Sequence, residues 1–113
     1  MKSISKSNID KSLGEIFREY RTIKKLTQEA VAEELEISVK YISRIENGNG
    51  GVKIETLVNY MNFLGIPPNI LFNDVLTNEE LHAELELSKK AHKLSDEKRK
   101  FIISVIDLLD ENK

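Results

Sequence analysis

The sequence predicts an all-α protein, with a five-helix domain over residues 12–73 followed by a C-terminal helical extension over residues 74–113. Two observations carry this prediction. Apolar residues recur at spacings of three and four, which is the period of an α-helix. Ser and Thr caps, together with Gly and Pro stops, divide the chain into segments of helical length. With 113 residues, the chain has room for one small domain and an appendage.

The first helix is expected to follow a polar segment. Residues 1–11 are weakly patterned, and we expect them to form a flexible N-terminal arm. Ser12 and Glu15 then make a capping box that begins the helix. The inward stripe of this helix is predicted to consist of Leu13, Phe17 and Tyr20. Two further apolar residues lie off that stripe, Ile16 and Ile23.

The stretch 27–48 predicts two short helices separated by a tight turn. Thr27 caps the first, which runs to Leu35, and Ser38 caps the second, which runs to about Glu46. The inward residues of the pair are predicted to be Val31, Ala32, Leu35, Ile42 and Ile45. The outward row of the second helix is Val39, Lys40, Ser43 and Arg44. Such a row can enter the DNA major groove, although a plain helical hairpin has the same pattern.

Glycine and proline delimit the rest of the domain. The run NGNGG over 47–51 ends the second helix, and we favour simple turn geometry over phosphate contact for Gly50 and Gly51. A fourth helix is expected to stop at Gly65. Its inward residues are predicted to be Ile54, Leu57, Val58 and Met61. After Pro67 and Pro68, a short turn is expected to close the core with Ile70, Leu71 and Phe72.

The extension predicts two more helices. Thr77 and Glu80 form a capping box for a helix that runs to about His92, and Ser95 caps another. The last helix is apolar over most of its circumference, so it must be buried on two sides. One side is expected to cover its own domain near Ile16 and Ile23, and the other to contact a second copy through Phe101, Ile102, Val105, Ile106 and Leu109. The alternative is that this helix only completes the core of a monomer.

Charge is unevenly distributed along the chain. Residues 1–72 carry ten Lys and Arg against nine Asp and Glu, whereas residues 73–113 carry seven against ten. The first segment is therefore nearly neutral, at +1, and the acidity lies in the extension, at −3. A DNA-binding domain of this charge is expected to use a few placed contacts and to avoid indiscriminate association.

Several classes of protein are disfavoured. The chain has no cysteine, no signal-like segment and no apolar run of about 20 residues, so we expect a cytoplasmic protein. There is no cysteine nucleophile and no glycine-rich phosphate loop after a strand, so we expect no enzyme and no cofactor. His82 has the helical spacing to share a metal ion with Glu79 and Glu86, but we favour solvated surface charge and expect no metal.

Residues 12–72 resemble the helix-turn-helix domain of the lambda repressor and Cro type, the XRE-like regulators. The motifs that carry the resemblance are Leu13-Gly14, Arg21, Thr27-Gln28-Glu29, the run YISRIENG, and Leu64-Gly65-Ile66. The resemblance implies a five-helix DNA-binding fold and a sequence-specific transcriptional regulator. It further implies a repressor that binds double-stranded DNA as a homodimer on an inverted repeat, with two reading helices one helical turn apart.

The resemblance also implies residue roles. The bases are read by Val39, Lys40, Ser43 and Arg44, with Arg44 suited to guanine and Val39 to a thymine methyl. Gln28, Ser38 and Asn47 are expected to contact backbone phosphate. The alternatives are that Ser38 and Asn47 are only helix caps, a role that can coexist with phosphate contact, and that Gln28 is an exposed helix residue. Lys53 is expected to add a phosphate contact, although it is not part of the family pattern. Arg21 and Glu46 form an ion pair between the first helix and the end of the reading helix. Tyr41 either stacks on the sugar-phosphate backbone or packs at the core edge, and we favour packing.

Three residues depart from the family pattern. Glu36 and Lys25 occupy turn positions where glycine is common, so each turn must either strain a non-glycine residue or change its geometry. Lys53 replaces the usual hydroxyl cap of the fourth helix, which weakens that start but places a cation near the DNA.

Two alternative functions stay open on the sequence. One is an antitoxin-type interaction module whose extension masks a toxin, and the other is a restriction-modification controller that also activates transcription. A protein partner such as a toxin or an antirepressor is compatible with either reading. An antitoxin is expected to have an extension that is disordered in isolation, whereas a plain regulator is expected to have a folded, self-associating one.

Overall fold

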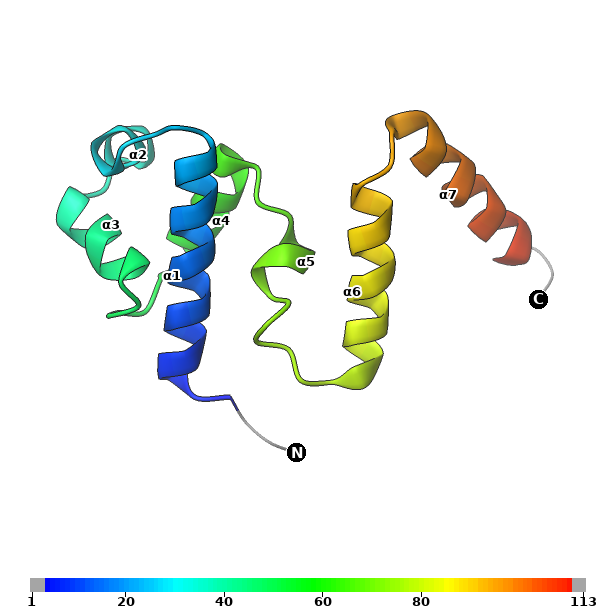
Figure 1. Ribbon diagram of the computed structural model, residues 1–113, viewed down its shortest axis with the longest axis horizontal. Coiled ribbons are helices and arrows are strands. Elements are labelled where there is room, and N and C mark those ends of the chain that lie inside the picture. Colours follow the sequence, from blue (N-terminus) through cyan, green and yellow to red (C-terminus); the bar gives the residue numbers. More distant parts are fainter. Residues whose placement is uncertain (1–3, 111–113) are drawn as a thin grey trace. The chain divides into compact units, whose positions relative to one another are not determined.

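The computed structural model describes residues 4–110, and every regular element in that range is a helix. The helices are α1 (Lys6–Ile23), α2 (Gln28–Leu35), α3 (Val39–Glu46), α4 (Ile54–Leu64), α5 (Pro68–Leu71), α6 (Glu79–His92) and α7 (Asp96–Asp110), shown in Figure 1. The all-α prediction is confirmed. The chain divides into two compact units, unit one over residues 1–78 and unit two over residues 79–113. Unit one extends past the expected end at residue 73, and Val75 is still buried.

The N-terminal arm predicted over residues 1–11 is wrong for most of its length. Helix α1 begins at Lys6, and the side chain of its N-cap Ser5 accepts a hydrogen bond from the Asn8 amide at 3.2 Å. Ile9 packs against the core and Asp10 is buried, so this first part of the helix is tied to the unit. The predicted start at Ser12 is therefore too late, because one apolar residue among polar neighbours gives little periodic signal. Residues 1–3 of the predicted arm lie outside the described residues.

The core of unit one gathers side chains from α1 to α5. At its centre the rings of Phe17 and Tyr60 stack with centroids 4.2 Å apart. The other members of the buried cluster are Leu13, Ile16, Val31, Ala32, Ile42, Ile45, Leu64, Ile66 and Leu71. Ile16 was expected off the inward stripe but is buried in this cluster. Ile23 is 65% exposed.

The predicted inward face of α4 is only half right. Leu57 and Met61 pack against the core, but Ile54 and Val58 are exposed. The buried residues of α4 are Thr56, Tyr60 and Leu64. The helix is apolar on more than one side, and the stacking of Tyr60 on Phe17 selects the face that turns inward. Hydrophobic spacing alone does not distinguish these faces.

Two turns in unit one hold non-glycine residues in the left-handed region. Glu36, the C-cap of α2, has φ 56°, and Lys25 has φ 58°. Of the two geometries that were open, the chain adopts the strained one at both positions, at a cost on the order of 1 kcal/mol each. Gly65 has φ 67° at the end of α4, as its predicted role as a helix stop requires.

Unit two consists of α6, α7 and the turn between them. Ser95 begins α7, since its hydroxyl accepts a hydrogen bond from the Lys98 amide at 3.3 Å. No residue of either helix is buried, and several large apolar side chains of α7 are exposed. Among the described residues no helix has both the length and the apolar character needed to cross a membrane.

Candidate nucleic-acid interface

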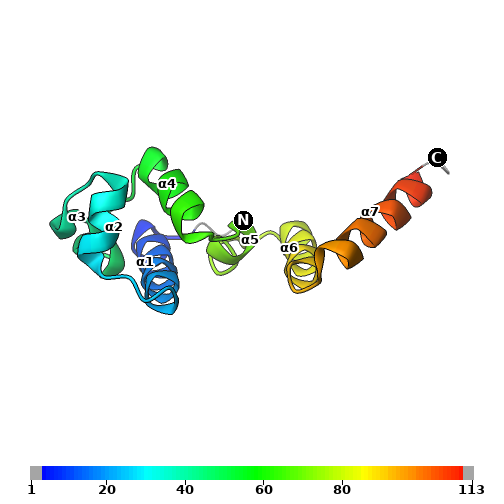
Figure 2. The ribbon, with the colours of Figure 1, turned by 90° about the horizontal axis from the view of Figure 1, so that it is seen from above.

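Helices α2 and α3 form a helix-turn-helix whose caps are local in sequence. The Thr27 hydroxyl accepts from the Ala30 amide at 3.0 Å, and the Ser38 hydroxyl accepts from the Tyr41 amide at 3.0 Å. Both helices therefore begin where the sequence predicts. Figures 1 and 2 show α2 and α3 on one side of α1 and α5 on the other. Within unit one, the outer surface of α3 is thus left uncovered.

Helix α3 buries one face and exposes the other. Ile42 and Ile45 are fully buried, as predicted. The predicted reading residues Lys40 and Arg44 are exposed, Val39 is 37% exposed and Ser43 is half-buried. The exposed row combines two cations, a hydroxyl and a branched apolar side chain. It offers hydrogen-bond donors and a methyl-binding surface, which are the chemistries that read base edges in the major groove.

Tyr41 links α3 to the start of α4 and contacts one of the predicted reading side chains. Its hydroxyl accepts a hydrogen bond from the amide of Lys53, the N-cap residue of α4, at 3.2 Å, while Lys53 itself makes no side-chain cap. The guanidinium of Arg44 lies 5.1 Å from the centroid of the Tyr41 ring, in cation–π contact. Gly50 makes room for Arg44, because a Cβ at this position would lie 2.8 Å from the Arg44 Nε atom. Tyr41 therefore packs, as favoured, and also orients Arg44.

A buried ion pair joins α1 to the end of α3. Arg21 donates from Nε to Glu46 Oε2 at 2.7 Å and from Nη2 to Oε1 at 2.9 Å. Its third bond goes from Nη1 to the Leu26 carbonyl at 2.8 Å. The Glu46 side chain is fully buried and that of Arg21 is 16% exposed. The pair expected from the sequence is thus present, and it fixes α3 against α1 and the α1–α2 turn.

The electrostatics of this cluster favour its charged form. Burial acts to raise the pKa of Glu46, but hydrogen bonds from Arg21 and Gln28 and the charges of Arg21 and Arg18 outweigh it, so the pKa lies below its usual range. The hydrogen bond to Glu46 raises the pKa of Arg21. Burial raises the pKa of the nearby Tyr60 hydroxyl strongly, and that hydroxyl has no hydrogen-bond partner. The cluster therefore consists of one buried carboxylate, that of Glu46, which accepts hydrogen bonds from Arg21 and Gln28.

The predicted phosphate-binding residues occupy different environments. Gln28 is half-buried and donates from Nε2 to Glu46 Oε1 at 3.1 Å, so one of its two N–H groups is already used within the protein. Ser38 is exposed and serves as the cap of α3. Lys53 is exposed at the start of α4. Asn47 is exposed, and its Oδ1 accepts a hydrogen bond from Arg18 Nη2 at 2.7 Å.

Arg18 is a site residue that the sequence reasoning missed. Besides its bond to Asn47, its Nε lies 3.6 Å from Glu46 Oε1, and Asn47 Nδ2 in turn lies 3.4 Å from the Ser43 hydroxyl. Arg18 therefore connects α1 to a predicted reading residue through one intermediate side chain. Its position one helical turn before Arg21 was the available signal, because residues three apart share a helix face.

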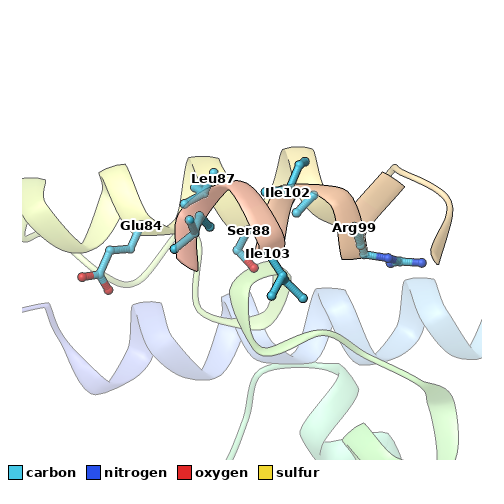
Figure 3. Close-up of a pocket in the computed structure, with 8 residues that line it drawn as sticks. Glu84, Leu87, Ser88, Arg99, Ile102 and Ile103 are labelled. Atoms are coloured by element: carbon cyan, nitrogen blue, oxygen red, sulfur yellow. The ribbon is translucent and has the colours of Figure 1, made fainter. Parts of the chain in front are cut away.

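Unit two contains an apolar groove between α6 and α7, with a volume of about 290 Å³ (Figure 3). Its walls are Glu84, Leu87, Ser88, Ala91, Arg99, Ile102, Ile103 and Ile106. Of the predicted dimerisation residues, Ile102 and Ile106 line this groove. Phe101, Val105 and Leu109 lie outside it and are exposed, at 69%, 39% and 68%. Within residues 4–110, no three acidic or metal-ligating side chains gather as a metal site would require.

The fold of unit one, with the exposed polar row of α3, is that of a helix-turn-helix DNA-binding protein of regulatory type. The family model described as "Helix-turn-helix domain" matches residues 14–81, which is more than half of the chain. The chain belongs to this family, and the XRE-type resemblance inferred from its motifs is thereby confirmed.

One solved structure similar to this chain is the crystal structure of the clp gene regulator ClgR from Corynebacterium glutamicum. The two share 23% sequence identity, with a TM-score of 0.55, over 74% of this chain and 83% of that one. At this level of identity the similarity bears on the fold, and it supports the helical architecture described above. No curated protein matches the chain.

Proposed function

We propose that the protein is a sequence-specific transcriptional repressor that binds an inverted-repeat operator as a homodimer. The observation that carries this proposal is the exposed polar row of α3, held by a buried carboxylate cluster at its C-terminal end. A reading helix must keep a fixed angle to discriminate between base pairs. Glu46, with its donors Arg21 and Gln28, supplies that constraint from inside the protein.

Each reading side chain suits a particular feature of the major groove. The planar guanidinium of Arg44 matches the N7 and O6 acceptors of guanine, and the contact with Tyr41 holds it near the end of α3. Lys40 suits guanine or a nearby phosphate, and Val39 suits the methyl group of thymine. The hydroxyl of Ser43 can either donate or accept a hydrogen bond at a base edge. Together these residues favour a half-site that contains both guanine and thymine.

The phosphate contacts flank this row at both ends. Ser38 lies at the start of α3 and Asn47 at its end. Gln28 keeps one N–H free of the bond to Glu46 and lies at the first position of α2, where helix amides and the dipole favour an anion. Lys53 adds a cation at the start of α4. Such contacts set the register of the protein on the duplex, while α3 discriminates between sequences.

Dimerisation through unit two completes the proposal. The side of α7 outside the groove exposes Phe101, Val105, Leu108 and Leu109. Contiguous apolar patches of this kind mark interaction surfaces in soluble proteins. A twofold dimer presents two copies of α3 to half-sites about 34 Å apart, and linking the two binding events multiplies affinity. Repression requires no further surface, because a bound dimer excludes other proteins from its operator.

The test combines mass measurement with selection of DNA. Light scattering is expected to give twice the chain mass of 13.0 kDa, and genomic fragments retained by the protein are expected to share an inverted repeat. Phe101→Ser combined with Leu109→Ser is expected to give a monomer with weakened binding. Ile54→Ser, which removes an equally exposed apolar side chain from unit one, is the control and leaves the dimer intact.

Two results would contradict the proposal. A monomeric wild-type protein that retains no DNA would point to a protein partner on α7, as in the antitoxin alternative. If a dimeric protein retained fragments that share no repeat, the proposed sequence specificity would be contradicted.

A further inference from the structure

Helix α1 approaches the C-terminal end of α3 more closely than a side chain would allow. A Cβ atom added at Gly14 would lie 2.3 Å from the Ile45 carbonyl oxygen and 3.0 Å from that of Glu46. Both neighbours are backbone atoms, so they have little freedom to move. Gly14 therefore fixes which face of α1 borders the last turn of the reading helix.

Two cations lie on that same face of α1. Lys11 precedes Gly14 by three residues and Arg18 follows it by four, and these are the spacings that share one helix face. Lys11 borders the loop after α3, because a Cβ at Gly48 would lie 3.0 Å from both Cα and Cγ of Lys11. Arg18 donates to the Asn47 side chain at 2.7 Å. Lys11 and Arg18 thus lie on either side of the C-terminal end of α3.

The loop after α3 supplies no positive charge of its own. Residues 47–52 read NGNGGV, without a charged side chain. Apart from Arg44 in the last turn of α3 and Lys53 after the loop, the positive charge beside the end of α3 comes from α1. Lys6 also lies near this loop, with its Nζ 3.6 Å from the Cβ position of Gly51, but its charge is offset by Asp10 at 2.9 Å.

The charge of Arg18 is not cancelled by the buried carboxylate. Glu46 is shared between Arg18 and Arg21, and the closer partner is Arg21, at 2.7 Å against 3.6 Å. The Arg18 side chain is 51% exposed, so the excess positive charge of this trio lies at the surface. Lys11 is exposed as well. Two exposed cations two helical turns apart thus lie beside the end of α3, Arg18 at Asn47, itself a proposed phosphate contact, and Lys11 at Gly48.

We propose that Lys11 and Arg18 form a phosphate-binding edge on α1 that contacts the DNA backbone beside the half-site read by α3. This inference rests on the proposed DNA-binding function and adds a second element to the interface. The edge supplies the placed positive charge that a nearly neutral unit one needs for DNA. It also restricts Asn47, because the Arg18 bond occupies the amide oxygen and one N–H of Nδ2 donates to the Ser43 hydroxyl, which leaves the second N–H as the donor for phosphate.

A purely structural role for the same cations makes a different prediction. Cations near a helix C-terminus stabilise its dipole, so Lys11 and Arg18 would then act on α3 without touching DNA. Their removal would lower the melting temperature and leave the salt dependence of binding unchanged. A phosphate contact instead releases counterions, and its loss changes that salt dependence.

The experiment measures affinity for random-sequence duplexes and for an enriched fragment at salt concentrations from about 50 to about 200 mM. Lys11→Gln and Arg18→Gln are each expected to reduce the magnitude of the slope of log K against log salt by about 0.9. The preference for the enriched fragment over random DNA is expected to stay the same, because phosphate contacts carry no sequence information. Arg18→Lys keeps the charge and is expected to keep the wild-type slope.

Lys24→Gln is the matched control, since Lys24 lies at the other end of α1 beside Gly65. It is expected to leave the slope unchanged. Slopes for Lys11→Gln and Arg18→Gln equal to that of the control would overturn the phosphate edge while the DNA-binding function stands. A wild-type protein that binds neither DNA would overturn both proposals.

Substitution of Glu15 is expected to change DNA affinity in the opposite direction. It is exposed on α1 between Lys11 and Arg18, so its carboxylate would repel phosphate at this edge. Glu15→Gln is expected to raise affinity several-fold at low salt. Glu34→Gln is the control, because Glu34 lies beside Asn59 and Asn62 of α4 and away from the proposed edge. If both variants changed DNA affinity equally, only the net charge of the protein would matter. That result would overturn the placement of DNA phosphate beside Lys11 and Arg18.

Discussion

Arg21 and Glu46 meet through two parallel hydrogen bonds, of 2.7 and 2.9 Å, across 25 residues of sequence. The carboxylate is fully buried, so its stability depends on these donors. Because Glu46 ends α3 and Arg21 belongs to α1, the pair couples the folding of unit one to the angle between these two helices.

Removing Arg21 is expected to destabilise unit one and to weaken DNA binding together. Arg21→Ala leaves the Glu46 carboxylate buried without its main partner, at a cost of about 3 kcal/mol. The free energy of unfolding from urea titration, followed by a mobility-shift assay, measures both effects. Lys24→Ala removes an exposed cation from the end of the same helix and is expected to change stability little. Wild-type stability in Arg21→Ala would contradict the role of the pair.

The lowered pKa of Glu46 predicts acid sensitivity. A carboxyl group whose pKa is lower in the folded state adds stability above its unfolded pKa, about 4.3, and this stability is lost as the pH falls through its folded value. The free energy of unfolding is therefore expected to fall as the pH drops below about 4.3. In Glu46→Gln this dependence is expected to be shallower. Glu86→Gln, which alters an exposed carboxylate, should keep the wild-type profile.

Substitutions at Gly14 and Gly50 are expected to affect different properties, protein stability in one case and DNA preference in the other. Gly14→Ala drives a methyl group against backbone carbonyls of α3 and is expected to destabilise unit one by about 2 kcal/mol or more. Gly50→Ala meets only the flexible Arg44 side chain, so it is expected to alter DNA preference with little loss of stability. Thermal melting and competition between DNA fragments separate the two. Similar melting temperatures for both variants would contradict the close approach of α1 and α3.

The turn between α2 and α3 is expected to be stabilised by glycine. Glu36 adopts φ 56°, so Glu36→Gly relieves strain and is expected to raise stability by about 0.5 kcal/mol after the entropic cost of glycine. Glu34→Gly, inside α2, is the control and is expected to lower stability by about 1 kcal/mol. Chemical denaturation of the two variants gives the sign of each change in the free energy of unfolding. A loss of stability in Glu36→Gly would show that the turn is not strained.

Sequence reasoning succeeded where the determinants are local. The starts of α2 and α3 follow from Thr27 and Ser38, whose hydroxyls cap amides three residues away. The inward faces of these helices follow from periodic spacing, since each helix has a single apolar stripe. Such features need no knowledge of what the helix packs against.

The features that the sequence missed depend on distant partners. The start of α1 is stabilised by the packing of Ile9, and the orientation of α4 by the stacking of Tyr60 on Phe17, 43 positions earlier in the sequence. The bond from Arg18 to Asn47 spans 29 residues. No local pattern encodes the partners of Tyr60 and Arg18, although the helix face of Arg18 could be inferred from Arg21, and an amphipathic residue such as Tyr60 gives no clear inward signal. The start of α1 differs, because its Ser5 cap is local and was overlooked.

The contact between Arg44 and Tyr41 also affects the entropy of recognition. An arginine on an exposed helix ordinarily samples many rotamers, and freezing such a side chain on binding costs about 0.5 to 1.5 kcal/mol. In this protein the contact with the Tyr41 ring restricts Arg44 without DNA, and the absence of a side chain at Gly50 leaves room for that conformation. Part of the ordering therefore accompanies folding, and under the function proposed above Arg44 would lose less conformational entropy on contacting a base.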